Sequence, residues 1–218
     1  MDARLTAAIV PVYERVLEHP FLAGLTDGSL PDAAFRQYVI QDALFLTDYA
    51  RALALCAARS GAAADLHMFC SHATEAIDVE RALHDELMGD LGISASDLDG
   101  AEQSPACRGY TSFLLATCAL GAEADALAAI LPCYWIYWEV GRVLVGRGSP
   151  DARYRLWIET YADEDFGRAV SAVVDIADRA FAGLTDAVAD SAAAHARISA
   201  RYEWMFWDSA LRRESWLV

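Results

Sequence analysis

The segment from Asp32 to Arg59 repeats its apolar side chains with a period close to that of an α-helix. These apolar residues stand at positions 35, 38, 39, 45, 46, 49, 50, 53 and 54. Such a stripe must be buried against another element, because a single helix cannot cover its own apolar face. Nowhere in the sequence do runs of β-branched residues alternate with turn signals, so we expect the partners to be helices as well.

Gly, Pro and polar clusters divide the rest of the sequence into further helical segments. Turn-rich or polar connectors are expected at 24–31, which reads GLTDGSLP, and at 94–105. The predicted helices cover residues 2–18, 32–59, 64–91, about 106–120, 122–145, 151–161, 163–182 and 186–213. No repeat and no domain boundary is evident. We therefore predict a single all-α domain over residues 1–218, built as a helical bundle of about eight helices.

The composition excludes several classes of partner. The net charge is −15, from 17 basic and 32 acidic residues, which argues against binding to nucleic acid or to an anionic membrane surface. No run of about 18 uninterrupted apolar residues is present, so no membrane-spanning helix is predicted. The five cysteines form no CxxC pair, and no charged-then-apolar leader opens the chain. We therefore expect a reduced, cytoplasmic compartment.

The segment ALAAILPCYWIYWEVG, residues 126–141, is apolar enough for a buried helix but contains a thiol, two tyrosines and a glutamate. Pro132 removes a backbone donor and is expected to bend or restart the helix, which would place Cys133 in a first turn. Unpaired amide groups and the helix dipole at such a place favour a thiolate. Tyr137, four residues on, is expected on the same face. The alternative is a core helix with a buried, inert cysteine.

Two carboxylates stand among large apolar residues. Asp42 is expected to share a helical face with Phe45 and Tyr49. It is either a solvated residue at the edge of the apolar stripe or a group aimed into a cavity, where it would bind a cationic or amidine-like ligand. Glu203 is nearly the only charge among the aromatics of residues 202–207. It is either a surface glutamate or a buried general acid or base with a raised pKa.

Other familiar enzyme motifs are absent or incomplete. His72, Glu75, Glu80 and His84 have spacings that a metal ion could use, but no second Glu-x-x-His motif is present and the stretch is dense in charge. No metal site is therefore predicted. The sequence also lacks a G-x-S-x-G elbow, a P-loop and a G-x-G-x-x-G motif, which excludes the corresponding hydrolase and nucleotide-binding classes.

Six segments of the sequence resemble the thiaminase II, or TenA, family, in the family's order and at its spacing. They read HPFLAGLTDGSLP (19–31), YVIQDALFLT (38–47), GYTS (109–112), LPCYWIYWEVG (131–141), YRLWIETYAD (154–163) and YEWMFWDSALRRESW (202–216). The resemblance implies an all-α bundle similar to haem oxygenase, with the site buried among the helices, and assembly as a homotetramer. It implies a small-molecule substrate and neither a metal nor an organic cofactor.

The resemblance also implies an activity. This is the hydrolysis of 4-amino-5-aminomethyl-2-methylpyrimidine to the hydroxymethyl pyrimidine and ammonia, a step of thiamine salvage, with cleavage of thiamine into pyrimidine and thiazole as a companion reaction. One alternative keeps the fold but acts on a different aminopyrimidine or thiamine breakdown product. Another is a pyrimidine- or thiamine-binding protein without turnover, and a weaker third is a metal-dependent oxygenase.

Three residues match the family's reacting groups. Cys133, in its LPCYW setting, places the sequence with the cysteine-containing form of the family and matches the nucleophile that adds to the pyrimidine ring. Glu203 matches the general acid and base. Asp42 matches the carboxylate that holds the pyrimidine and activates it by stabilising its protonated form.

Five aromatic residues complete the implied site. Tyr110, Tyr137 and Tyr161 match the family's site tyrosines, although each is also compatible with an ordinary tyrosine at the edge of a core. Phe45 stands where some members have a tyrosine, so the stacking face is kept and the hydroxyl is lost. Phe206 is expected to help the other aromatics enclose the ring and exclude solvent.

Overall fold

The computed structural model describes the backbone of all 218 residues and the side chains of residues 1–77 and 87–218. Over this described backbone every regular element is an α-helix, which confirms the predicted all-α fold. The ten helices found there are α1 (Ala3–Leu17), α2 (Pro20–Asp27), α3 (Asp32–Arg59), α4 (Ala63–Leu91), α5 (Ala95–Asp99), α6 (Pro105–Leu120), α7 (Glu123–Val145), α8 (Ala152–Tyr161), α9 (Glu164–Ala182) and α10 (Asp186–Arg212). None of the described helices has the length and apolar composition of a membrane span.

Two of these helices, α2 and α5, lie in or beside segments where the sequence predicts turns. Helix α2 begins at Pro20, whose fixed φ suits the first helical position, and His19 Nδ1 accepts the Phe21 N–H at 3.1 Å. Helix α5 begins with a capping box, in which Ser94 and Asp97 each accept the other's backbone N–H. Local capping therefore forms helices that are too short to show an apolar period in the sequence. The predicted number of about eight helices is for this reason lower than the ten that are found in the described backbone.

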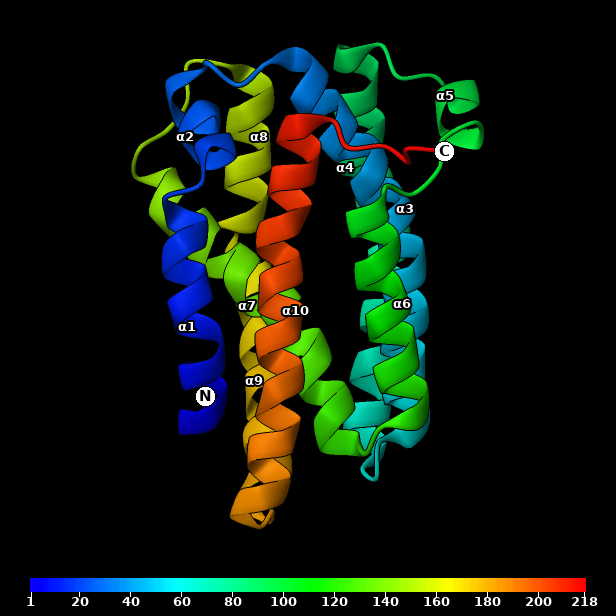
Figure 1. Cartoon of the computed structure of the whole chain (residues 1–218), viewed down its shortest axis with the longest axis vertical. Helices are drawn as coiled ribbons and strands as arrows, with labels where there is room; N and C mark the ends of the chain where they lie inside the picture. The colour runs from blue at the N-terminus through cyan, green and yellow to red at the C-terminus, as the bar shows by residue number, and fades with distance from the viewer.

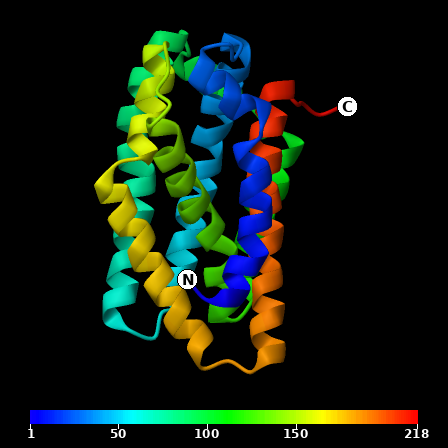
Figure 2. The same cartoon turned by 90° about the vertical axis from the view of Figure 1, so that its left-hand side faces the viewer.

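The long helices pack around α7, which crosses the middle of the bundle (Figure 1). Helices α3, α4 and α6 lie together on one side of it, α1 and α9 lie on the other, and α10 lies in front, where it packs against α7, α1, α3 and α6. Figure 2, turned by 90°, shows α1 and α9 on the face toward the viewer, with α7 visible between them. Because α7 contacts α1, α3, α6, α8, α9 and α10, its side chains are mostly buried, as its apolar sequence predicts.

A glycine on α7 allows the end of α8 to approach closely. A Cβ atom added at Gly141 would lie 2.5 Å from the carbonyl carbon and oxygen of Tyr161, far inside contact distance. Only glycine therefore leaves room for the backbone at the end of α8. This close packing brings the Tyr161 ring to 4.7 Å from the Tyr137 ring, measured between centroids.

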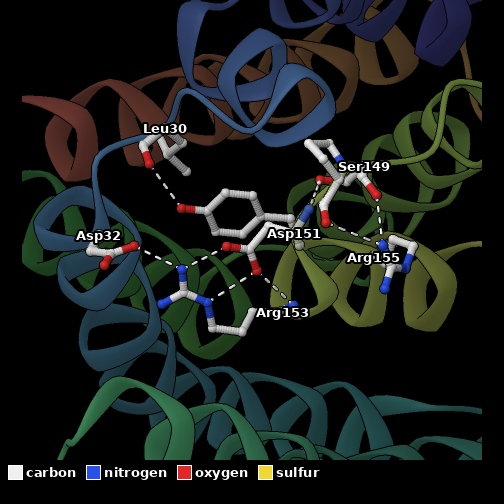
Figure 3. Close-up of polar contacts among 8 residues, drawn as sticks. Leu30, Asp32, Ser149, Asp151, Arg153 and Arg155 are labelled. Carbon is white, nitrogen blue, oxygen red and sulfur yellow. Dashed lines mark hydrogen bonds and ion pairs between the residues drawn. The ribbon is translucent and has the colours of Figure 1, made fainter.

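Polar contacts fix the other end of α8 (Figure 3). The Arg153 guanidinium bonds Asp32 at 2.8 Å, at the start of α3, and Asp151 at 2.6 Å. The hydrogen bond from Arg153 lowers the pKa of Asp151. The Tyr154 hydroxyl donates to the Leu30 carbonyl at 2.8 Å. Helix α8 is thus held at both ends, and its last residues have a defined place beside α7.

Candidate active site

A cavity of about 600 Å³ lies between α3, α4, α7, α8 and α9. Its lining differs between two regions, one buried and one open to solvent. We call four of its buried or half-buried residues the deep wall: Asp42, Phe45, Cys133 and Tyr137. We call the exposed acidic group the mouth, which comprises Glu75, Glu159, Asp163 and Asp165.

The structure brings the predicted site residues together. Those that line the cavity are Asp42, Phe45, Cys133, Tyr137 and Tyr161. The others, Tyr110, Glu203 and Phe206, lie behind the deep wall. The Tyr110 and Phe206 rings lie 5.0 Å and 5.6 Å from the Phe45 ring, between centroids, and Tyr110 contacts Glu203 directly. Residues from α3, α6, α7, α8 and α10 therefore meet at one place.

Burial decides between the two interpretations of each carboxylate. Asp42 is 5% exposed and Glu203 is 1% exposed, so neither is a solvated surface residue. Asp42 lines the cavity from the side of α3, whereas Glu203 lies behind the cavity on α10. Two carboxylates buried at one site are costly for the fold, and such an arrangement is typical of functional sites.

The surroundings of Cys133 differ from the prediction. Helix α7 runs without interruption from Glu123 to Val145, so Cys133 lies in its middle and not in the first turn of a new helix. The expected effect of a helix N-terminus on the thiol was therefore wrong, because the amide groups of a helix interior are not free to act on a side chain. The thiol acts instead on Glu203, because hydrogen bonding with Cys133 lowers the pKa of that carboxyl.

Four interactions determine the pKa of the Glu203 carboxyl. Together they raise its pKa to about 8, and the largest cause is burial, because the ionised form loses its hydration. A hydrogen bond from Tyr110 lowers the pKa, the negative charge of Asp42 raises it, and hydrogen bonding with Cys133 lowers it. Glu203 therefore changes its protonation near neutral pH, as a residue that both donates and accepts protons should.

Two side-chain hydroxyls bond the main chain of α7 one turn before Cys133. Ser199 donates to the Ala129 carbonyl at 2.7 Å, and Tyr49 donates to the Ile130 carbonyl at 3.0 Å. Pro132 has no N–H to bond the Ala128 carbonyl, so the helix is weakened in this turn and the two side-chain hydrogen bonds support it. Helices α3 and α10 thus hold the segment that carries Cys133.

A chain of side-chain hydrogen bonds ends at the Tyr137 hydroxyl. The indole N–H of Trp157 donates to the Tyr38 hydroxyl, which donates to the Tyr137 hydroxyl, each at 3.2 Å. Burial raises the pKa of Tyr137 well above its ordinary value, so this hydroxyl keeps its proton. Sequence reasoning did not select Tyr38, Trp157 or Ser199. The first two stand inside the resembling segments 38–47 and 154–163, but Ser199 stands in none.

The residues considered as metal ligands are only partly described. His72 lines the cavity, and its Nδ1 lies 3.0 Å from the Tyr134 hydroxyl; burial lowers the pKa of this imidazole. Glu75 accepts a hydrogen bond from Ser71. Glu80 and His84 lie outside the described side chains. Among the side chains that are described, no three His, Cys, Asp or Glu groups lie close enough to hold a metal ion.

The mouth was not predicted from the sequence. Its carboxylates come from α4, from the end of α8 and from the start of α9. Of the described residues that line the cavity, none is a lysine or an arginine, although Arg168 outside the lining pairs with Asp165. The mouth is therefore negative over its described part, and its charges are solvated.

The protein is therefore an all-α helical bundle that encloses a cavity lined with candidate catalytic residues. The chain belongs to the TENA/THI-4/PQQC family, whose model matches residues 6–213. The chain is 34% identical over 204 residues to a Bacillus subtilis (strain 168) protein named aminopyrimidine aminohydrolase. This match covers 94% of the chain and 86% of that relative.

Solved structures resemble the fold closely. The TenA homologue protein from P. horikoshii OT3 superposes with a TM-score of 0.87 at 26% identity, over 95% of this chain and 96% of that one. A domain from Shewanella denitrificans OS217 that is described as having a heme oxygenase-like fold gives a TM-score of 0.75 at 15% identity, over 98% and 93% of the two chains. This second likeness concerns the fold alone, and it confirms the predicted similarity to haem oxygenase.

Proposed function

We propose that the protein is an aminopyrimidine aminohydrolase. It hydrolyses 4-amino-5-aminomethyl-2-methylpyrimidine to the hydroxymethyl pyrimidine and ammonia in thiamine salvage, and it cleaves thiamine as a companion reaction. The observation that carries the proposal is the meeting of three groups at one cavity: Cys133 and the buried Asp42 line it, and the buried Glu203 lies behind its deep wall, hydrogen-bonded to Tyr110. The name and close similarity of the Bacillus subtilis relative support the same reaction.

The first step is activation of both reactants. Asp42 accepts hydrogen bonds from the exocyclic amine and the protonated ring nitrogen. It thereby stabilises the protonated pyrimidine, which is electron-poor. Glu203, in its ionised form, takes the proton of the Cys133 thiol. The resulting thiolate adds to ring carbon C6, and the electron pair of the broken ring double bond is delocalised over the ring.

The second step exchanges the leaving group. The ring electrons expel the amine from the exocyclic methylene while Glu203 returns its proton to the departing nitrogen, which leaves as ammonia. Water then adds to the methylene carbon, and Glu203 removes one of its protons. The bond between C6 and sulfur breaks, the ring becomes aromatic again, and Glu203 returns the proton taken from water to the Cys133 sulfur, so both residues recover their starting forms. The sum is amine plus water to alcohol plus ammonia.

The test is ammonia release from the aminomethyl pyrimidine, with Cys133→Ser as the control. Wild-type protein is expected to release ammonia, and Cys133→Ser should lose turnover by roughly 10³-fold or more, because the hydroxyl is a far weaker nucleophile. Calorimetry should find the pyrimidine still bound by the variant. Near-full activity of Cys133→Ser would refute the nucleophile. Tight binding by the wild type without ammonia release would instead indicate a binding protein.

Assays across related amines would identify the preferred substrate, by comparing kcat/KM for the aminomethyl pyrimidine, its formylated precursor and thiamine. We further propose, from the family resemblance, that residues 1–218 form one domain and that the protein is a cytoplasmic homotetramer. Light scattering on the purified protein would measure the assembly.

A further inference from the structure

Three short contacts connect Glu203 to the main chain of α7 through two hydroxyl groups. The Tyr110 hydroxyl lies 2.6 Å from Glu203 Oε1 and 2.8 Å from Ser199 Oγ. Ser199 Oγ lies in turn 2.7 Å from the Ala129 carbonyl oxygen. The side chains of all three residues are at most 1% exposed. Two oxygens at such distances are stable neighbours only when a proton lies between them.

Counting protons shows that these contacts depend on the state of Glu203. Each hydroxyl supplies one proton and the Ala129 carbonyl supplies none. When Glu203 is ionised, two protons must serve three contacts, so one pair of oxygens faces each other without a proton whichever way the hydroxyls turn. When Glu203 is protonated, it donates to Tyr110, Tyr110 donates to Ser199, and Ser199 donates to Ala129. Every contact is then a hydrogen bond.

We propose that Ser199 is a positioning residue that acts through Tyr110 to stabilise the protonated form of Glu203. The serine does so because it competes with the ionised carboxylate for the single proton of Tyr110. Ser199 and Glu203 are four residues apart on α10, so one face of that helix carries both. The inference rests on the proposed function, in which protonated Glu203 delivers its proton to the departing amine.

The other groups that face Glu203 do not depend on Ser199. On α3, Asp42 raises the pKa of Glu203 by charge repulsion. On α7, the Cys133 thiol favours the ionised form by donating to it. The hydroxyls of Tyr49 on α3 and Tyr137 on α7 also interact with Glu203, and burial raises the pKa of each well above its ordinary value, so both stay neutral. Ser199 and Cys133 therefore act on Glu203 in opposite directions, and the serine is separable by mutation.

The experiment measures the midpoint of Glu203 titration in the intact protein. Infrared spectra of protein with isotope-labelled glutamate show the carbonyl band of a protonated carboxyl, and the Glu203→Gln variant assigns it. We expect Ser199→Ala to move this midpoint to lower pH by about one unit, the size of one hydrogen bond. In the pH profile of kcat/KM, the limb that reports Glu203 is the one that disappears in Glu203→Gln. In Ser199→Ala this limb should move to lower pH by the same amount.

Ser209→Ala is the matched control. Ser209 is also a buried serine of α10, but its hydroxyl donates to the Phe206 carbonyl of its own helix at 2.9 Å. This variant should leave the midpoint unchanged. In a Tyr110→Phe background the chain is already broken, so adding Ser199→Ala should produce no further shift. Should Ser199→Ala not fold, Ser199→Cys carries the test, since its weaker donor should move the midpoint in the same direction by less.

Several results would overturn the proposal. They are an unchanged or raised midpoint in Ser199→Ala, an equal shift in Ser209→Ala, or a shift that persists in the Tyr110→Phe background. The infrared titration needs no turnover. If the wild type releases no ammonia, the proposed function fails while the role of Ser199 is still decided by the midpoints.

Discussion

Glu203, behind the deep wall of the cavity, and Glu159, at its mouth, are the same side chain in opposite surroundings. Glu203 is 1% exposed, and burial raises its pKa to about 8. Glu159 is exposed and lies at the end of α8, beside the other carboxylates of the mouth. A charge in water is screened by solvent and ions, whereas a charge removed from water acts strongly on its neighbours. The deep wall and the buried groups behind it should therefore control chemistry, and the mouth should not.

The strongest test of this contrast is to replace each glutamate, Glu203 and Glu159, by glutamine, and the larger effect is expected at Glu203. Glu203→Gln should lower kcat by roughly 10²- to 10⁴-fold, the range that general acid and base groups contribute. Glu203 is protonated below about pH 8, so wild-type kcat/KM should rise toward that pH as the carboxylate that accepts the thiol proton forms. The variant should lose this rise. A pH–rate profile of Glu203→Gln with its lower limb intact would refute the assignment.

The stability of the fold should show the same contrast. The pKa of Glu203 is raised from 4.5 to about 8 in the folded state. Between these values the unfolded chain releases the proton and the folded protein keeps it, so stability falls as pH rises through this window. Glu203→Gln removes this penalty and should raise the free energy of unfolding above pH 8 by on the order of 3–5 kcal/mol.

Urea unfolding at pH 5 and at pH 8.5 measures this effect. Glu203→Gln should be distinctly more stable than the wild type at the higher pH and close to it at the lower one. Equal pH dependence in the two proteins would mean that Glu203 ionises in the fold as easily as in water, and its contrast with the exposed Glu159 would disappear.

Asp42 tests whether the deep wall recognises the pyrimidine. Asp42→Asn exchanges a charge-assisted hydrogen bond for a neutral one, so the affinity for the hydroxymethyl pyrimidine should fall by about 10- to 100-fold. Asp48→Asn on the same helix is the control, because Asp48 lies outside the cavity lining and bonds Gln103 and Arg51 instead. Unchanged affinity in Asp42→Asn by calorimetry would remove Asp42 from the site.

The fold was largely predictable because its long helices carry their own signals. The segment from Asp32 to Arg59 has an apolar period and ends before Gly61, and α3 has the predicted bounds. Helix α2 was not predicted, because the helix start that Pro20 and His19 form depends on a single cap and not on a period. Short helices that depend on one cap, and not on a repeated apolar pattern, are therefore difficult to predict from the sequence.

The closeness of the candidate site residues was predictable, but the contacts between them were not. The resemblance assigned Cys133 and Glu203 to one site, and the packing brings α7 and α10, which carry them, to the same cavity. The local argument, that Pro132 would give Cys133 a helix N-terminus, was wrong because the helix continues through the proline. Which group shares a proton with the thiol, and which serine lies behind that group, depends on how α10 packs on α7. No local pattern contains that information.

The mouth supplies the smallest expected effect. Glu159→Gln removes one exposed charge, so kcat and the free energy of unfolding should stay within about twofold and about 0.5 kcal/mol of the wild type. Any change in KM for a cationic amine should shrink as salt is added, because ions screen solvated charges over about 10 Å at 0.1 M. Steady-state kinetics at two salt concentrations measures this. A loss of kcat as large as that of Glu203→Gln, unaffected by salt, would show that the mouth takes part in the chemistry and would end the distinction between the two regions.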